Sequence, residues 1–120
     1  MLQPFVSQVV GEGEWSLVFL GGEYSHAVLK RPAAGDFRVQ EEFGGSSRAA
    51  DAPDALRESA AQALAAVEHP WLYARVDGVR DDDGRLLLME LEMLEPLLFL
   101  AHHPQAPERF ADAILNAVAR

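Results

Sequence analysis

A turn signal at the centre of residues 73–96 constrains the fold of this chain more than any other feature. The stretch reads YARVDGVRDDDGRLLLMELEMLEP, in which two runs rich in apolar residues flank an acidic turn that ends in glycine. Asp-Gly supplies the backbone conformations that a tight turn between antiparallel strands requires. A two-residue turn at Asp83-Gly84 would pair Asp82 with Arg85. The pattern therefore predicts a β-hairpin and an antiparallel sheet.

The register of this hairpin places charged residues opposite one another. With a two-residue turn, Asp77 lies opposite Glu90 and Arg75 lies opposite Glu92, all on one face of the sheet. The other face is apolar and is expected to pack on the core. It carries Ala74, Val76, Leu87, Met89, Leu91 and Met93.

The acidic cluster on the charged face has two interpretations. Like charges directly opposite one another destabilise a strand pair, so Asp77, Glu90 and Glu92 together need an explanation. One interpretation is a solvated acidic face, partly balanced by Arg75, because antiparallel sheets often expose one polar face. The other is a bound divalent cation such as Mg²⁺, which prefers carboxylate oxygens.

The remaining elements predict an α+β fold in one domain that spans residues 1–120. The first hairpin is expected to turn at Gly21-Gly22 and to place a row of residues on the core, namely Trp15, Leu17, Phe19, Tyr24 and Val28. His26 is predicted to lie on the same face as a partly buried, hydrogen-bonded ring. The expected order is strands over 14–20 and 23–30, a long loop over 33–50, a helix over 53–67, the acidic hairpin, and a helix over 106–118.

The two predicted helices have apolar stripes at helical spacing. The first begins near Pro53, which suits a first helical turn, and its stripe comprises Leu56, Ala60, Ala63, Leu64 and Val67. The second is expected to bury Phe110, Ile114 and Val118. The fold class is therefore antiparallel β-hairpins packed with two helices.

Composition narrows the classes of partner. The 120-residue chain has a formal net charge of −9, which argues against nucleic acid and anionic membranes as partners. It contains no cysteine, so disulfide frameworks and thiolate metal sites are excluded. No apolar run is long enough to span a bilayer and no signal peptide is evident, so a cytoplasmic location is expected.

The motifs on the acidic hairpin resemble those of the ATP-grasp ligases. In that superfamily an Arg-x-Asp strand is followed by a Glu-x-Asn strand, and here Arg75-Val76-Asp77 and Glu90-Leu91-Glu92 stand in those places. Glu92 replaces the usual Asn. The resemblance covers nearly the whole chain and the C-terminal half of the family fold. It is closest to the glutathione synthetase and ribosomal-protein glutamate ligase branch, and D-alanine–D-alanine ligase is a more distant relative.

The resemblance implies a role for each matching residue. Asp77, Glu90 and Glu92 would bind Mg²⁺ beside the phosphates of ATP, and Arg75 would stabilise the acylphosphate. In the basic loop Lys30 and Arg38 would hold the phosphates or the acyl substrate; without the resemblance, both are ordinary surface charges. The remaining matches are nucleotide contacts: Gln3, Phe5 and Val6 resemble the strand that binds adenine, and Glu14 the carboxylate on the ribose.

The implied reaction is the ATP-dependent joining of a carboxylate to an amine through an acylphosphate. The family's substrate domain and ATP lid precede the hinge strand, and this chain begins at that strand. A fragment, one half of a split enzyme and a remnant without turnover are all consistent with that start. The chain is therefore expected to be a ligase portion that is inactive alone, completed by an N-terminal partner. The alternative is a non-catalytic nucleotide-binding or self-associating module, and a homo-oligomer is expected because a missing half exposes apolar surface.

Overall fold

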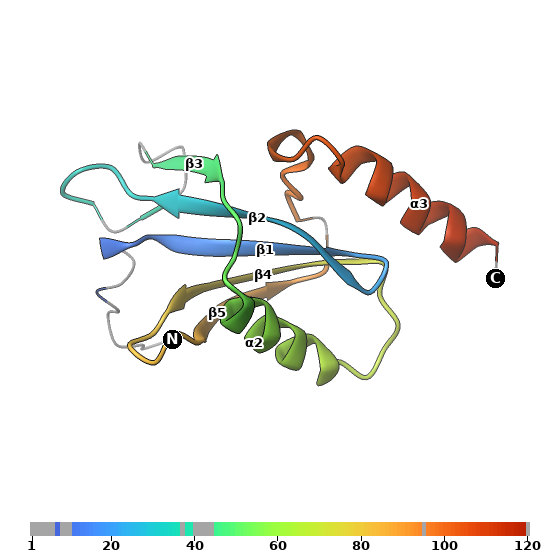
Figure 1. The fold of residues 1–120 in the computed structure, drawn as a ribbon, viewed down its shortest axis with the longest axis horizontal. Coiled ribbons are helices and arrows are strands. Elements are labelled where there is room, and N and C mark those ends of the chain that lie inside the picture. The colour runs from blue at the N-terminus through green and yellow to red at the C-terminus, as the bar shows by residue number, and fades with distance from the viewer. Residues whose placement is uncertain (1–6, 8–10, 37, 40–44, 95, 120) are drawn as a thin grey trace.

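A five-stranded antiparallel sheet in the order β3-β2-β1-β4-β5 forms the centre of the computed structural model, with two helices packed against it (Figure 1). The structure describes residues 7, 11–36, 38–39, 45–94 and 96–119. The strands are β1 (Glu14–Leu20), β2 (Glu23–Arg31), β3 (Ser46–Ala49), β4 (Tyr73–Arg80) and β5 (Leu86–Glu92), and the α-helices are α2 (Asp54–Ala65) and α3 (Ala106–Val118). The predicted α+β fold with antiparallel hairpins and two helices is confirmed.

The main hydrophobic core lies between α2 and one face of the sheet. The helix contributes Leu56, Ala60 and Leu64, which recur at the spacing of one helix face and are buried. Alternate residues of three strands meet them, because successive side chains on a strand point to opposite faces. These strand residues are Trp15, Leu17, Phe19, Ala27, Leu29, Ala74 and Val76. This face is the one that the sequence pattern predicts best.

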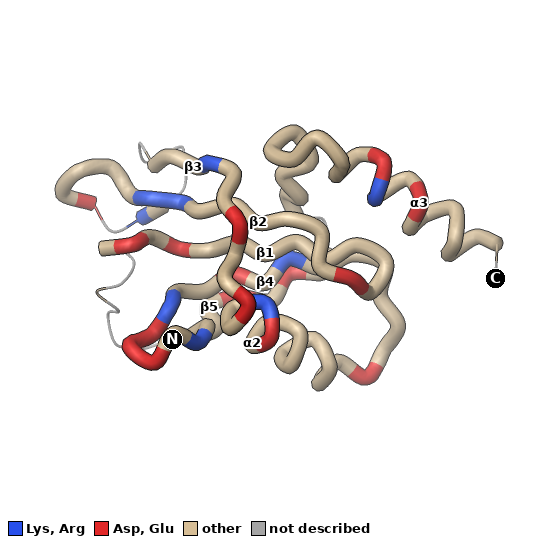
Figure 2. Tube along the Cα trace, in the orientation of Figure 1, with Lys and Arg blue, Asp and Glu red and all other residues tan. Residues whose placement is uncertain are grey.

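The opposite face of the sheet has a polar end and an apolar end. At the apolar end Val18 and Leu20 pack with Leu98 and Ala113, so that α3 covers the sheet near the β1–β2 turn. Charged residues occupy the other end, where β1 begins and β2 ends, while the middle of both strands carries none (Figure 2). This polar end of an otherwise apolar sheet face is the candidate location of a functional site.

The first hairpin contains a β-bulge that changes which face its residues occupy. The register shifts between Val18, which pairs with His26, and Phe19, which pairs with Tyr24, so Ser25 is the extra residue. The prediction for Tyr24 is confirmed, and its ring contacts Phe19 edge to face. The face predicted for Val28 and His26 was wrong, because the bulge turns both to the face opposite α2. His26 is nevertheless buried and hydrogen-bonded through both ring nitrogens, as its other prediction states.

The second hairpin has a wider turn than predicted. The Asp81 N–H donates to the Arg85 carbonyl and the Gly84 N–H to the Asp81 carbonyl, with Gly84 in the left-handed region at φ +83°. Residues 82–84 therefore form a three-residue loop with glycine at its left-handed position. The predicted pair of Asp82 with Arg85 was wrong.

A β-bulge in β5 then restores the predicted register at the charged residues. The pairing shifts between Asp77, which faces Glu90, and Gly78, which faces Leu88, so Met89 is the extra residue. The bulge brings β5 close to Gly78, where a Cβ would collide with the Leu87 carbonyl oxygen.

The bulge also changes the apolar face of β5. Leu91 and Met93 pack on the core as predicted, but Leu86 takes the place expected for Leu87, which is exposed. Met89 lines a cavity on the charged face instead. These two predictions were wrong because an extra residue reverses the alternation of side chains.

Two other features differ from the sequence-based expectations. The long loop contains β3, a short edge strand paired with β2. On α3, Phe110 packs against the apolar cluster, whereas Ile114 and Val118 are exposed and Ala106 and Ala113 are buried instead. None of the described helices has the length and apolar character needed to cross a membrane.

Candidate functional site

The polar end of the sheet is organised around the buried carboxylate of Asp77. Only 2% of this side chain is exposed, because Asp77 lies on β4, which has β1 on one side and β5 on the other. Arg75 donates to both carboxylate oxygens, with its Nη2 2.9 Å from Oδ2, and the Ser16 hydroxyl donates to Oδ1 at 2.6 Å. A buried charge needs an opposite charge and hydrogen bonds, and Asp77 has both.

A second ion pair borders Asp77 on the side of β2. Lys30 and Glu14 are cross-strand partners, and Lys30 Nζ lies 3.0 Å from Glu14 Oε1 and 3.9 Å from Asp77 Oδ2. The pairing of β1 with both β2 and β4 therefore brings Glu14, Lys30, Arg75 and Asp77 together. Two cations held beside a cavity can bind an anionic ligand.

Glu90 lies on the far side of Asp77 and is more exposed. Its side chain is 54% exposed and lies 4.0 Å from Arg75 Nη2. Partial burial raises the pKa of Glu90, and the Asp77 charge and a hydrogen bond with Glu92 raise it further. Glu92 pairs with Arg75 across the strands and accepts the Leu94 N–H at 3.3 Å. The predicted acidic cluster thus consists of a buried Asp77, which is ion-paired with Arg75, and two glutamates that are more exposed.

A cavity of about 430 Å³ opens beside these residues. Its polar wall comes from the charged residues of the sheet, and its apolar wall includes Leu97 and Phe99, which follow β5. The lining residues are Glu14, Lys30, Val39, Ser47, Arg75, Asp77, Met89, Glu90, Leu97 and Phe99. Small-molecule sites combine apolar walls with convergent polar groups, and this cavity has both, with more charged groups than most.

Four of the predicted site residues lie elsewhere or outside the described residues. The Arg38 side chain is 47% exposed and forms a two-pronged ion pair with Asp36, with Nη2 to Oδ2 at 2.9 Å. It is not among the described residues that line the cavity. Gln3, Phe5 and Val6, the predicted adenine contacts, lie outside the described residues.

Sequence reasoning missed residues that complete the site. Ser16 is one, and a polar residue in a strand of buried apolar neighbours is a signal that could have identified it. Its contact with Asp77 depends on β1 lying beside β4, which no local pattern reveals. Leu97 and Phe99 come from an irregular segment without periodicity and gave no signal.

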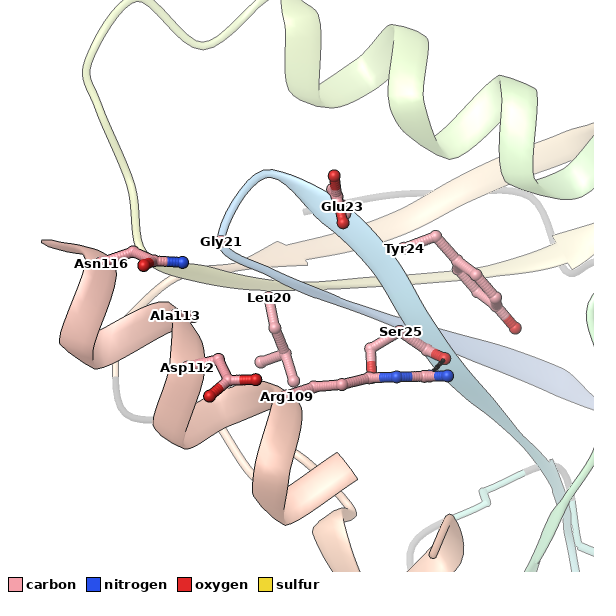
Figure 3. Close-up of a pocket in the computed structure, with 9 residues that line it drawn as sticks. All are labelled: Leu20, Gly21, Glu23, Tyr24, Ser25, Arg109, Asp112, Ala113 and Asn116. Atoms are coloured by element: carbon pink, nitrogen blue, oxygen red, sulfur yellow. Dashed lines mark hydrogen bonds between the residues drawn. The ribbon is translucent and has the colours of Figure 1, made fainter. Parts of the chain in front are cut away.

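A second hollow of about 460 Å³ lies between the β1–β2 turn and α3 (Figure 3). Its basic residue is Arg109, whose guanidinium donates to the Ser25 carbonyl and to Gln105 Oε1. Glu23 and Asp112 also line this hollow. Because Arg109 already bridges α3 and β2, it acts first as a structural link.

Comparison with known proteins relates the chain to part of a longer enzyme. It is 39% identical over 121 residues to the cycloserine biosynthesis protein DcsG of Streptomyces lavendulae, and the match covers 95% of this chain and 40% of that protein. The crystal structure of D-cycloserine synthetase DcsG superposes with a TM-score of 0.81 at 36% identity, over 97% of this chain and 41% of that one. The chain therefore spans about two fifths of the length of the relatives it matches. No protein-family model matches it.

D-Alanine–D-alanine ligase of Bacillus anthracis shares the fold at lower identity. Its ATP complex superposes with a TM-score of 0.56 at 19% identity, covering 84% of this chain and 36% of the ligase. A second structure of that ligase gives a TM-score of 0.58 at 22% identity, covering 86% and 38%. At this identity the likeness concerns the fold alone. The chain is thus homologous to part of DcsG and shares the fold of part of D-alanine–D-alanine ligase.

Proposed function

We propose that this chain is one domain of an ATP-dependent carboxylate–amine ligase that needs a further portion for turnover. The observation that carries the proposal is the cavity in which Arg75 and Lys30 flank the buried Asp77, within a chain 39% identical to part of DcsG. Neither the glutathione synthetase-like branch nor any particular acyl substrate is needed for this proposal.

The proposed reaction has two steps. A carboxylate oxygen of the substrate attacks the γ-phosphorus of ATP, and the bond from that phosphorus to the β–γ bridging oxygen breaks, which releases ADP. The nitrogen of an amine then attacks the acyl carbon and loses a proton, and the C–O bond to the phosphate breaks. Such chemistry depends mainly on positioning and on charges held against the phosphates.

The side chains of the site suit these steps. Arg75 is held by Asp77 and faces the cavity, where its guanidinium would stabilise the charge on the transferred phosphoryl oxygens. Lys30 would approach the phosphates as a point charge. Glu14, its ion-pair partner, would accept hydrogen bonds from the ribose hydroxyls.

The residues also fit Mg²⁺ that arrives bound to ATP. Among the described residues, no three His, Asp or Glu side chains are placed to hold a metal ion by themselves. Mg²⁺ on a nucleotide, however, needs only one or two protein carboxylates beside phosphate and water oxygens. Glu90 and Glu92 would supply them, while Asp77 has little capacity left after accepting from Ser16 and Arg75. When bound, the ion would offset the charge of the phosphates.

Titration calorimetry with ATP, in the presence and absence of Mg²⁺, tests this proposal. Lys30→Gln should weaken Mg-ATP binding by about tenfold or more, the loss of one charge-assisted contact. Arg85→Gln, which makes the same charge change in the exposed hairpin turn, should leave the affinity within about twofold. No binding of ATP by the wild-type chain, or equal losses in the two variants, would contradict the nucleotide site. ADP release on adding an N-terminal partner portion tests turnover.

A second candidate function is a non-catalytic module that self-associates. The observation in its favour is the exposed apolar face of α3, where Leu115 and Val118 are 62% and 74% exposed. Light scattering distinguishes the two functions: a monomer that binds Mg-ATP tightly argues against the module, and an oligomer that binds no nucleotide supports it.

A further inference from the structure

The segment Leu97–Phe99 contributes Leu97 and Phe99 to the apolar wall of the cavity, and it is held at two successive carbonyl groups. Arg75 Nη1 donates to the Leu97 carbonyl at 3.2 Å, and His26 Nε2 lies 2.8 Å from the Leu98 carbonyl. His26 and Arg75 share a row across the sheet, since both pair with Val18 from opposite sides. The two side chains therefore reach the same segment from β2 and β4.

Phe99 has a backbone conformation that needs such support. Its φ of 52° and ψ of 41° are left-handed, and among the described residues it is the only non-glycine residue with positive φ. A bulky aromatic residue adopts this conformation only when its surroundings enforce it. The Leu98 carbonyl belongs to the peptide plane before Phe99, so a bond to that oxygen restrains the φ of Phe99.

The hydrogen bonds of His26 determine which ring nitrogen carries the proton. A carbonyl oxygen only accepts, so Nε2 donates to Leu98, and Nδ1 of the neutral ring accepts from the Ser25 hydroxyl at 2.8 Å. Burial lowers the pKa of His26, which keeps the ring neutral. Arg109 of α3 donates to the Ser25 carbonyl and so anchors this part of β2 (Figure 3).

The wall in turn contacts Arg75. The guanidinium carbon of Arg75 lies 5.9 Å from the centre of the Phe99 ring, while the Leu97 carbonyl and Asp77 accept its hydrogen bonds. A change in the backbone at Leu98 would therefore displace both the Leu97 carbonyl and the Phe99 ring, and so alter the orientation of the guanidinium. We propose that His26 is a positioning residue: its bond to Leu98 holds Phe99 and Leu97 where they orient Arg75 in the cavity. The consequence for nucleotide binding rests on the proposed function, but the positioning does not.

Nuclear magnetic resonance of the full chain tests the positioning without any ligand. His26→Leu should shift the Arg75 Nε–H and Phe99 ring signals, and His26→Gln, which keeps a donor near the Nε2 position, should restore them. Leu64→Ala is the matched control, because it removes buried volume on the α2 face and should lower the melting temperature without moving either signal. Unchanged signals in His26→Leu would overturn the proposal.

Two further measurements complete the test. In the wild-type chain the ¹⁵N shifts of the His26 ring should show the proton on Nε2; a proton on Nδ1 would overturn the proposal even if His26→Leu fails to fold. With Mg-ATP as the probe, His26→Leu should bind about tenfold more weakly and His26→Gln within about threefold of wild type. If the wild-type chain binds no Mg-ATP, the proposed function fails, and the Arg75 signal alone decides the positioning.

Discussion

The two hairpins of the sheet each contain one β-bulge, and in each the bulge decides where a polar residue lies. In β2 the extra residue Ser25 moves His26 from the α2 face to the opposite face. In β5 the extra residue Met89 keeps Glu90 on the face of Asp77, from which the three-residue turn alone would have removed it. Bulges are common beside functional sites because they redirect side chains.

The hairpins differ in how their register could be inferred. In the first, the two-residue turn was predicted correctly and the bulge alone made the faces of Val28 and His26 wrong. In the second, the turn has one residue more than predicted, and the unpredicted bulge at Met89 shifts the register back by one residue. The pairing of Asp77 with Glu90 was therefore predicted correctly although the turn was not. Correct strand partners at a site therefore do not establish which turn and which bulge produce that pairing.

Removing the charge of Asp77 should have the largest effect on the second hairpin. Asp77→Ala leaves Arg75 and Lys30 without their buried anion, which should lower the free energy of unfolding by about 3–5 kcal/mol. Asp77→Asn keeps an acceptor for Ser16 and should cost less. Urea unfolding measures both. A loss below about 1 kcal/mol for Asp77→Ala would show that strand pairing, not the ion pair, holds this end of the sheet.

Gly78→Ala should have the next largest effect, because it acts on the bulge itself. The new methyl group would meet the Leu87 carbonyl oxygen and the Leu86 side chain, so β5 must move, at about 1–3 kcal/mol. Nuclear Overhauser contacts between Asp77 and Glu90 should weaken or vanish.

Gly84→Ala is the matched control for Gly78→Ala, since it strains the turn through its positive φ but meets no atom within 4 Å. It should cost about 1–2 kcal/mol while the Asp77–Glu90 contacts persist. If both variants lost these contacts, the turn and not the bulge would set the register at the site.

Much of the fold could be predicted because its signals are local. Alternating apolar residues and Gly-containing turns predicted both hairpins, and the apolar stripe of α2 predicted its buried Leu56 and Leu64. The short edge strand β3 was missed, since its sequence Ser46–Ala49 is polar and its burial pattern does not alternate clearly. On α3, Ile114 and Val118 satisfy the helical spacing yet are exposed, because a stripe does not reveal whether anything packs on it.

The site was predictable where partners lie in one hairpin and unpredictable where they come from distant segments. Asp77 and Glu90 follow from the hairpin pattern, and Glu14 and Lys30 from the family resemblance. Ser16 required knowledge of the strand order, and Phe99 occupies a conformation that no sequence rule favours. The resemblance implied a phosphate contact for Arg38, which stays a prediction; in the described structure Arg38 forms an ion pair with Asp36.

Acidification should have a smaller effect, and one that reports on the first hairpin. Burial lowers the pKa of His26 in the folded chain, and the nearby charges of His103 and Arg109 lower it further. The hydrogen bond to the Leu98 carbonyl raises the pKa but does not offset these effects. The unfolded chain therefore takes up a proton first as the pH falls below about 6.5, the ordinary pKa of histidine, and the folded state loses stability from there down to its own lower pKa.

A single histidine changes the free energy of unfolding by at most about 1.4 kcal/mol per pH unit. Urea unfolding of the wild-type chain and of His26→Gln between pH 7.5 and 5 isolates the contribution, because the two proteins differ only at His26. The difference in unfolding free energy should shrink as the pH falls. A difference that stayed constant would mean that His26 is protonated to the same extent in the folded and unfolded chains, and the bulge at Ser25 would then not bury a neutral ring.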